Sequence, residues 1–399
     1  MAPRLDDSLS LPCGLTLGNR LAKAAMTECV ADPRDNQPNA RHETLYRRWA
    51  RGGLGLVVTG NVMVDRRYLE RTTNVVIDEH TDRAALRRWA EAAQSDGVPA
   101  LVQVNHAGRQ CSRFVSRRPV APSEVQVKVF GSFAKPRALE DHEVDAIATR
   151  FAEVARDVVD AGFAGVQVHA AHGYLANQFL SPRTNLRDDR WGGSLENRAR
   201  FGRAVLAAIR NEVGPAFPVA VKLNSADFQR GGFSEDESLQ VLHWLQGDGL
   251  DLVEISGGSY ESRVMLDKPL SDREAFFLDY ARKARAAVDI PLMVTGGFRS
   301  RAIMEQALAQ GALDVVGLAR PFTHNPDVAR DLCTGRIVRA EDPPPMPGLA
   351  RLGGTSEAMM SVAQMALLSK GKDPARGMSL RAVLGALVQE GVSLVRGKG

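Results

Sequence analysis

The chain has 399 residues, of which 44% are hydrophobic and 25% are charged, as is usual for a soluble globular protein with a substantial core. The net charge of +4 is spread along the sequence, and basic clusters such as Arg47-Arg48 and Arg117-Arg118 are sparser than in a nucleic-acid-binding arm. No apolar run reaches the roughly 18 residues that a membrane-spanning helix needs, and the first residues lack the apolar segment of a signal peptide. Nucleic-acid and membrane partners are therefore not expected.

The cysteines indicate a reducing compartment. They lie far apart in sequence and form no Cys-x-x-Cys pair: Cys13, Cys29, Cys111 and Cys333. This spacing is not typical of a metal site, an iron–sulfur cluster or a disulfide framework. We expect a cytoplasmic protein with free thiols.

Short β-branched runs alternate with helical patterns along most of the chain, which predicts repeated βα units and a parallel sheet. Helical periodicity is clear in 81–95 and 143–161. No Gly-x-Gly-x-x-Gly follows the first strand, as an open dinucleotide-binding sheet would require, so a closed (β/α)8 TIM barrel of the α/β class is favoured. The eight expected strands are 21–26, 54–59, 100–104, 164–168, 218–223, 250–255, 291–295 and 313–318.

The two ends of the chain add to this barrel. Residues 8–18 alternate and contain turn residues, which predicts a small hairpin that plugs the bottom of the barrel. The proline-rich stretch 340–354 ends the compact fold, and 355–399 reads as helical. We therefore expect a barrel over 1–338 and a linker with a helical C-terminal extension over 339–399, which serves packing or homo-oligomer contact.

In such barrels, function gathers where the strands end. Polar or small residues stand at or near the ends of the expected strands, and this suits a large planar ligand with a polar edge: Met26-Thr27, Thr59-Gly60-Asn61, Gln103, His169, Lys222, Gly296-Gly297 and Ala319-Arg320. The last two pairs follow strands seven and eight, where these barrels commonly hold a phosphate. A tight turn at Gly296-Gly297 and a surface cation at Arg320 are the alternative reading.

His169 and His172 follow the fourth strand three residues apart. The pair would make a metal site if Glu254 or Asp227 completed it, but no third ligand lies nearby in sequence, and we expect no metal. Two histidines with purely structural hydrogen bonds are a further reading. Two neutral imidazole donors also suit the polarisation of a carbonyl or nitro oxygen, and Tyr174 could then deliver a proton.

Residues 169–198, HAAHGYLANQFLSPRTNLRDDRWGGSLENR, closely resemble the signature of the Old Yellow Enzyme family of FMN-dependent NAD(P)H oxidoreductases. The resemblance extends from about residue 8 to about residue 335. It continues in Asn19-Arg20, QVNHAGRQ (103–110), TGGF (295–298) and GLARPF (317–322). It implies an ene-reductase, a flavoprotein in which NADPH or NADH reduces FMN and the flavin then reduces an activated C=C bond.

The resemblance also implies residue roles. His169 and His172 would bind the electron-withdrawing oxygen of the substrate, and Tyr174 would protonate its α-carbon. The positions that match the family's flavin contacts are Ala24, Ala25, Met26 and Thr27 along the ring, Gly60 and Gln103 at its pyrimidine edge, Lys222 at N1, and Gly296, Gly297, Ala319 and Arg320 at the phosphate.

The chain departs from the family at several of these positions. Ala25 stands for the usual proline, Lys222 for an arginine and Ala319 for a glycine, and Thr27 stands where relatives carry cysteine. A point charge at Lys222 in place of a planar fork could alter the flavin potential. The cysteines and the length do not allow the version with an iron–sulfur cluster and a second flavin domain.

Two other functions stay open at this point. The same flavin site could demethylate, decarboxylate or dehydrogenate a specialised metabolite, or the barrel could be a non-catalytic flavin scaffold with a partner-binding tail. Substrate choice is expected to depend on the loop 112–138, whose aromatic and aliphatic residues either line an apolar wall or anchor the loop: Phe114, Val129, Phe130 and Phe133. The sequence carries no motif that separates NADH from NADPH.

Overall fold

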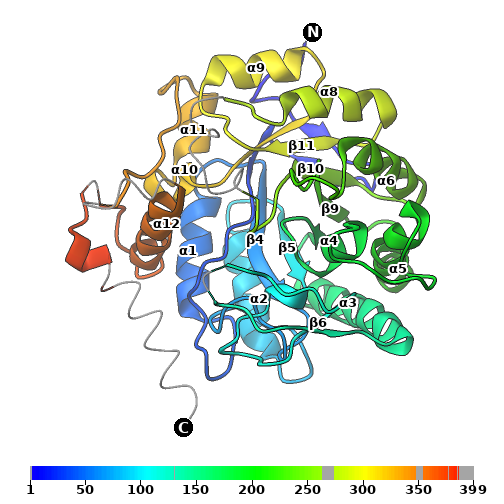
Figure 1. Ribbon diagram of the computed structural model, residues 1–399. Helices are drawn as coiled ribbons and strands as arrows, with labels where there is room; N and C mark the ends of the chain where they lie inside the picture. Colours follow the sequence, from blue (N-terminus) through cyan, green and yellow to red (C-terminus); the bar gives the residue numbers. More distant parts are fainter. Residues whose placement is uncertain are drawn as a thin grey trace.

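A computed structural model describes residues 2–129, 131–262, 274–346, 354–375, 377–383 and 385. Eight parallel strands close into a barrel with helices around it, which confirms the predicted (β/α)8 fold (Figure 1). Around the barrel the strands are β3 (Leu21–Lys23), β4 (Leu56–Met63), β5 (Ala100–Asn105), β8 (Gly165–Ala170), β9 (Val219–Asn224), β10 (Leu252–Ser256), β11 (Leu292–Thr295) and β12 (Val315–Leu318).

The helices between these strands form the outer ring, and several start at a side-chain cap. Ser194 and Ser234 accept backbone N–H bonds at the starts of α5 and α6, and Gly162 ends α3 with a φ of +88°. The helices are α1 (Ala40–Ala50), α2 (Arg83–Ala93), the short 3₁₀ turn η1 (Gly108–Gln110), α3 (Asp141–Ala161), α4 (Leu175–Leu180), α5 (Leu195–Val213), α6 (Glu235–Gly247), α8 (Leu278–Ala287), α9 (Arg301–Ala309), α10 (Pro321–His324), α11 (Val328–Cys333) and α12 (Gly354–Leu368).

The first two barrel strands differ in length from the prediction. β3 ends at Lys23, three residues early, whereas β4 runs on to Met63 through a register shift between Val58 and Asn61. The shift has a local cause, because the Gly60 N–H donates to Glu28 Oε1 at 2.8 Å rather than to a neighbouring strand. The bulge therefore lies where the mouth of the barrel begins.

The N-terminal hairpin lies where the sequence predicts it. β1 (Leu9–Ser10) pairs antiparallel with β2 (Thr16–Leu17). Leu11 and Leu17 are buried in one cluster with residues near the starts of the barrel strands, namely Ala22, Leu56, Leu101, Ala220, Leu252, Met293 and Val315. The hairpin closes the N-terminal end of the barrel, so a ligand enters from the other end.

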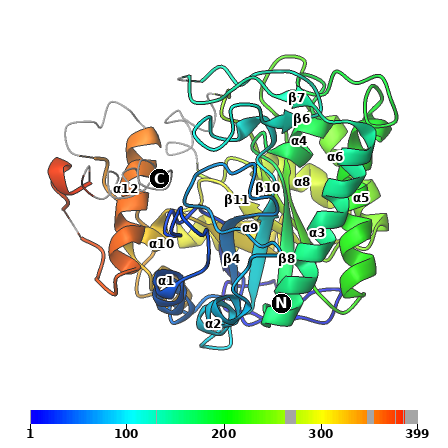
Figure 2. The ribbon, with the colours of Figure 1, turned by 90° about the horizontal axis from the view of Figure 1, so that it is seen from below.

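The opposite end carries the long loops. β6 (Val120–Ala121), β7 (Arg137–Ala138) and α4 lie at one end of the barrel and the N-terminus lies near the other (Figure 2). Helix α12 packs beside α10 and α1 at the outer surface (Figure 1). No helix within the described part of the chain is both long and apolar enough to cross a membrane.

Candidate active site

The end of β8 brings together the three residues that the sequence singled out as catalytic. The ring centroid of His169 lies 5.1 Å from that of His172 and 4.7 Å from that of Tyr174. His172 has a φ of +60°, and this left-handed turn, followed by Gly173 at +80°, folds the chain back at the strand end. Strand and turn thus place two imidazoles and a phenol at one point of the barrel mouth.

The two imidazoles are neutral hydrogen-bonding groups. Burial lowers the pKa of both rings well below the usual histidine value, and the positive charge of Lys222 lowers it further. His172 Nε2 lies 2.7 Å from Ser256 Oγ at the end of β10, and its backbone N–H donates to Asn224 Oδ1. The rings are held in place from β9 and β10 and stay uncharged at neutral pH.

Because several buried histidines are neutral in the folded state, we expect the protein to lose stability in mild acid. His42, with a pKa lowered to about 3, and His106, with a pKa lowered to about 4, share this property with His169 and His172, and burial is the main cause in each. A folded-state pKa below the unfolded value of about 6.5 gives stability that is complete above pH 6.5 and is lost as the pH falls. We expect the free energy of unfolding to drop between pH 6.5 and 5 by about 1.4 kcal/mol per pH unit for each such histidine.

Urea unfolding at a series of pH values measures this slope. His106→Asn should reduce it by one histidine's share, while His142→Gln, at an exposed position, should leave it unchanged. A flat profile from pH 6.5 to 5 would contradict the assignment.

Tyr174 is part of a hydrogen-bond network that the sequence did not reveal. Its hydroxyl lies 2.8 Å from the hydroxyl of Tyr260, which donates to Glu70 Oε1 at 2.8 Å. The other Glu70 oxygen accepts from Asn61 Nδ2 at 3.1 Å and from Thr27 Oγ1 at 3.2 Å. Tyr260, Glu70 and Asn61 therefore belong to the site, and Thr27 joins it through Glu70.

Charges in this network keep the phenols protonated. Burial raises the pKa of Tyr174 well above its usual value, and the negative charge of Glu70 adds to the effect. Burial and Glu70 act on Tyr260 in the same direction. Burial alone would raise the pKa of Glu70, but the charge of Arg71 and three side-chain hydrogen bonds outweigh it and lower that pKa. The carboxylate is thus ionised and Tyr174 remains an acid at neutral pH.

The barrel interior beneath this site is polar and internally paired. Gln103 Nε2 donates to Gln167 Oε1 at 2.7 Å, and Gln167 Nε2 donates to Glu254 Oε2 at 2.9 Å. Lys222 Nζ lies 2.9 Å from Glu254 Oε1, and both side chains are almost fully buried. Gln103 and Lys222, which we expect at the flavin, are therefore connected to each other through Gln167 and Glu254.

Residues 24–28 and Gly60 form the wall next to this interior. Ala24 is fully buried, and Met26 packs against the main core. A Cβ on Gly60 would lie 2.0 Å from Glu28 Oε2 and 2.4 Å from the Met26 carbonyl oxygen. This crowding accounts for the glycine independently of any ligand. Ala25 packs against the cluster at the base of the barrel.

The expected phosphate end gathers two guanidinium groups, but they are not free. Arg320 pairs with Glu357 of α12 and lies 3.5 Å from Asp342, which also binds Arg299 at 2.6 Å. Gly297, just after β11, has a φ of +80°, a backbone conformation that favours glycine. Gly296 precedes Gly297 in this turn, and Ala319 follows the neighbouring strand β12. The extension thus supplies the acidic partners of Arg320, an arrangement that the sequence did not predict.

Several polar groups at the strand ends fit a bound ligand such as FMN. Within the described part of the chain, both polar atoms of the Asn105 side chain and the hydroxyls of Ser225 and Thr295 are buried without a hydrogen-bond partner. They stand at the ends of β5, β9 and β11. Buried polar groups seldom stay unpaired, so donors and acceptors of a ligand suit this rim. Among the described residues, no three His, Cys, Asp or Glu side chains lie together as a metal site would need.

Comparisons with known proteins identify the family of the chain. The model of the NADH:flavin oxidoreductase / NADH oxidase family matches residues 13–338. The chain is 39% identical, over 84% of its length and 90% of the relative's, to the "NADH-dependent flavin oxidoreductase iliE" of Hypocrea jecorina.

Solved structures give the same result. The chain superposes on morphinone reductase with a TM-score of 0.72 and 25% identity, covering 86% of this chain and 92% of the other. A 2-naphthoyl-CoA reductase gives a TM-score of 0.79 and 26% identity, covering 84% of this chain and 53% of that longer one. A flavin enzyme that uses FMN and a nicotinamide reductant is therefore shown, and the chain belongs to the NADH:flavin oxidoreductase / NADH oxidase family.

Proposed function

We propose that this enzyme reduces alkenes activated by a carbonyl or nitro group, with NADH or NADPH as the source of electrons. The observation that carries the proposal is the grouping of two neutral imidazoles with a protonated phenol at the end of β8. The chemistry that FMN would supply when bound is hydride donation to the β-carbon of the alkene. The chain's own residues must then hold the substrate oxygen and deliver the proton.

His169 and His172 are proposed to donate hydrogen bonds to the substrate oxygen. Because they are neutral, they bind it without repelling Lys222, and their hydrogen bonds strengthen as negative charge develops on that oxygen. Tyr174 is proposed to place its proton on the α-carbon, while Tyr260 and Glu70 fix the position of its hydroxyl. The two histidines would thus bind the oxygen on which negative charge develops, and the tyrosine would supply the proton.

The residues proposed to hold FMN line the same mouth. Thr27 hydrogen-bonds to Glu70 and Gln103 to Gln167, and Lys222 offers a cation that would favour the anionic reduced flavin. Gly296, Gly297, Ala319 and Arg320 would surround the phosphate. Ala24, Ala25, Met26 and Thr27 would lie along the ring, with Gly60 and Gln103 at its pyrimidine edge. We assign these contacts to a barrel domain over 1–338, with 339–399 as an extension.

Purified protein tests the proposal in two steps. We expect the absorbance bands of bound flavin, bleached by anaerobic NADH or NADPH and restored when 2-cyclohexen-1-one or N-methylmaleimide is added, with the saturated product formed. Flavin that is reduced but never reoxidised by an activated alkene would overturn the proposal. If an unsaturated or demethylated product forms with an electron acceptor and no nicotinamide, the enzyme is a dehydrogenase or a demethylase instead.

A further inference from the structure

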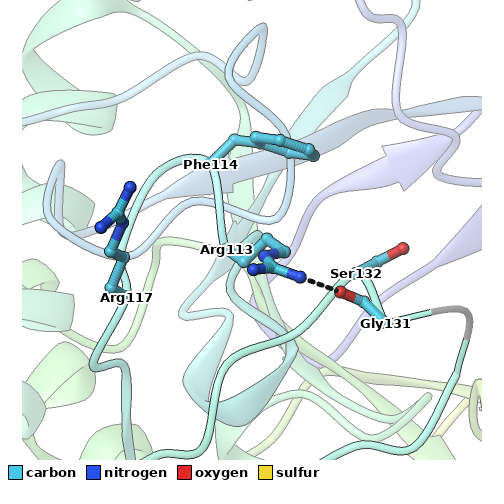
Figure 3. Close-up of a pocket in the computed structure, with 5 residues that line it drawn as sticks. All are labelled: Arg113, Phe114, Arg117, Gly131 and Ser132. Atoms are coloured by element: carbon cyan, nitrogen blue, oxygen red, sulfur yellow. Dashed lines mark hydrogen bonds between the residues drawn. The ribbon is translucent and has the colours of Figure 1, made fainter.

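The hydrogen-bond network around the proton donor is contacted from two sides. On the side of the long loops, the ring centroid of Phe133 lies 6.2 Å from that of Tyr260. Phe133 belongs to the loop over residues 112–138, which also surrounds a surface hollow of about 420 Å³ lined by Arg113, Phe114, Arg117, Gly131 and Ser132 (Figure 3). Phe114 is 59% exposed, so it is not buried as a loop anchor, and Phe130 lies outside the described residues. On the barrel side, the contact comes from β4.

Asn61 is the residue of β4 that contacts this network. Its Nδ2 donates to Glu70 Oε2 at 3.1 Å and lies 3.5 Å from the Tyr174 hydroxyl. Its Oδ1 accepts from Thr27 Oγ1 at 2.9 Å and from Asn74 Nδ2 at 3.1 Å. Because both ends of the amide are bound, its orientation is fixed, and the place of Asn61 bears directly on the acid.

Asn61 faces the barrel mouth because β4 carries one extra residue. Val58 pairs with Leu101 and Asn61 pairs with Gln103, so three steps along β4 match two steps along β5. Side chains of a strand alternate between its two faces, and Val58 lies in the cluster inside the base of the barrel. A regular strand would therefore turn Asn61 outward. With the extra residue, Asn61 shares the inner face with Gln103, and Val62 packs into the main core instead.

Side chains bind the backbone groups of this bulge. The Gly60 N–H donates to Glu28 Oε1 at 2.8 Å and to the Tyr46 hydroxyl oxygen at 3.0 Å. Tyr46 donates its own proton to Glu28 Oε1, which leaves its oxygen able to accept that N–H. The Gly60 carbonyl oxygen accepts from Thr59 Oγ1 at 2.8 Å, and Thr59 Oγ1 accepts from the Gln103 N–H at 3.0 Å. Glu28 thus provides the acceptor that the extra residue needs.

Glu28 is itself enclosed by helix α1 and a buried lysine. Glu28 is buried, and α1 supplies Tyr46. Lys23 Nζ lies 4.4 Å from the centre of the Trp49 ring of the same helix and donates to two backbone carbonyl oxygens. Burial lowers the pKa of Lys23 to about 8, and the negative charge of Glu28 partly offsets this effect. A cation therefore balances the carboxylate that binds the bulge.

We propose that Glu28 is a positioning residue for the proton donor. By binding the Gly60 N–H, its carboxylate holds the bulge of β4. The bulge turns Asn61 toward Glu70 and Tyr174, so loss of the acceptor at Glu28 displaces a partner of the acid while the acid itself is unchanged. The inference rests on the proposed function, because the effect is on proton delivery to the alkene.

Two variants of Glu28 form a matched pair. Glu28→Gln keeps an oxygen that can accept from the Gly60 N–H, whereas Glu28→Leu does not. Both remove the negative charge near Lys23, which lowers the pKa of that lysine further, so the amine can release its proton in either variant. If Glu28→Leu does not fold, adding Lys23→Met to both variants removes the lysine and keeps the same comparison.

Anaerobic reoxidation of the reduced flavin by 2-cyclohexen-1-one, followed by stopped-flow absorbance, measures the effect. We expect Glu28→Leu and Asn61→Ala each to slow this step about tenfold, as loss of a hydrogen bond to a charged group would, and Glu28→Gln to stay within about threefold of wild type. In Glu28→Leu/Asn61→Ala the second change should add less than about twofold, because both act through one amide. Reduction of the flavin by NADH should change by less than about twofold throughout.

Asp314→Leu is a control at the other end of the barrel. Asp314 Oδ2 also accepts the N–H of a strand residue, that of Leu292 at 2.8 Å, so the variant should lose stability and keep the wild-type rate of reoxidation. A wild-type rate in Glu28→Leu, a Glu28→Gln rate as slow as that of Glu28→Leu, or full additivity with Asn61→Ala overturns the inference.

Hydrogen exchange of the Gly60 amide tests the bulge without any substrate. We expect exchange to be about tenfold faster in Glu28→Leu than in Glu28→Gln, because only the first variant lacks the acceptor. Equal exchange in the two variants overturns the inference, whatever the enzyme reduces. A wild-type protein that reduces no alkene contradicts the proposed function instead.

Discussion

Replacing Tyr174 by phenylalanine is expected to slow alkene reduction by a factor of about 10² to 10⁴, the usual contribution of a positioned general acid. The change removes one oxygen from a buried ring that lies 4.7 Å from His169 and leaves the ring packing intact. Reduction of the flavin by NADH needs no proton from this phenol, so its rate should stay within about twofold of the wild-type rate. The variant therefore separates the two half-reactions.

Stopped-flow absorbance under anaerobic conditions measures each half-reaction by itself. Tyr280→Phe is a suitable control, because it removes another buried phenol hydroxyl, one that donates to Ser238 Oγ and takes no part in the hydrogen bonds that join Tyr174, Tyr260 and Glu70. Since the pKa of Tyr174 is raised, the wild-type rate of alkene reduction should also stay level between pH 7 and 10. Equal losses in both half-reactions of Tyr174→Phe would show that the tyrosine positions the flavin rather than donating a proton.

Replacing Lys222 by methionine is expected to destabilise the fold by about 3–5 kcal/mol. The cause is Glu254, whose fully buried carboxylate lies 2.9 Å from Lys222 Nζ and would keep only the hydrogen bond from Gln167. A buried charge without its partner has lost its hydration, and no ion-pair attraction offsets that loss. Urea unfolding followed by tryptophan fluorescence measures the difference.

The double variant Lys222→Met/Glu254→Leu distinguishes charge from packing. With both ions removed, most of the lost stability should return, because two apolar side chains replace a pair that was costly to desolvate. Glu254→Gln alone leaves the lysine cation without its anion and should also destabilise. If the double variant is as unstable as Lys222→Met, the ion pair does not account for the effect.

The order of strands could be read from the sequence because each strand is a buried, β-branched run, and the runs recur at the spacing of βα units. Their ends were harder to place. β3 stops at Lys23 because the buried ammonium turns to the carbonyl oxygens of Ala24 and Val58, and β4 runs past its expected end through the bulge at Gly60. Both effects come from contacts between residues far apart in sequence, Lys23 with Val58 and Gly60 with Glu28, that no local sequence pattern encodes.

The candidate site, like the strands, could be predicted from the sequence only in part. His169, His172 and Tyr174 were predicted together because they are neighbours in sequence at a strand end. Tyr260 and Glu70 were missed, because they reach Tyr174 from the loops after β10 and β4 and share no spacing with it. The partner of Arg320 was equally hidden, since helical periodicity in the extension does not say which surface Glu357 contacts.

The hydroxyl network at Tyr174 has a consequence for folding. It joins segments that are 86 and 190 residues apart, so loop closure over nearly half of the chain precedes its formation. No fragment that ends before β10 can hold the phenol against its partner. Recovery of alkene-reducing activity during refolding therefore reports that the segments from β4 to β10 have assembled, whereas recovery of helical signal reports only the local units.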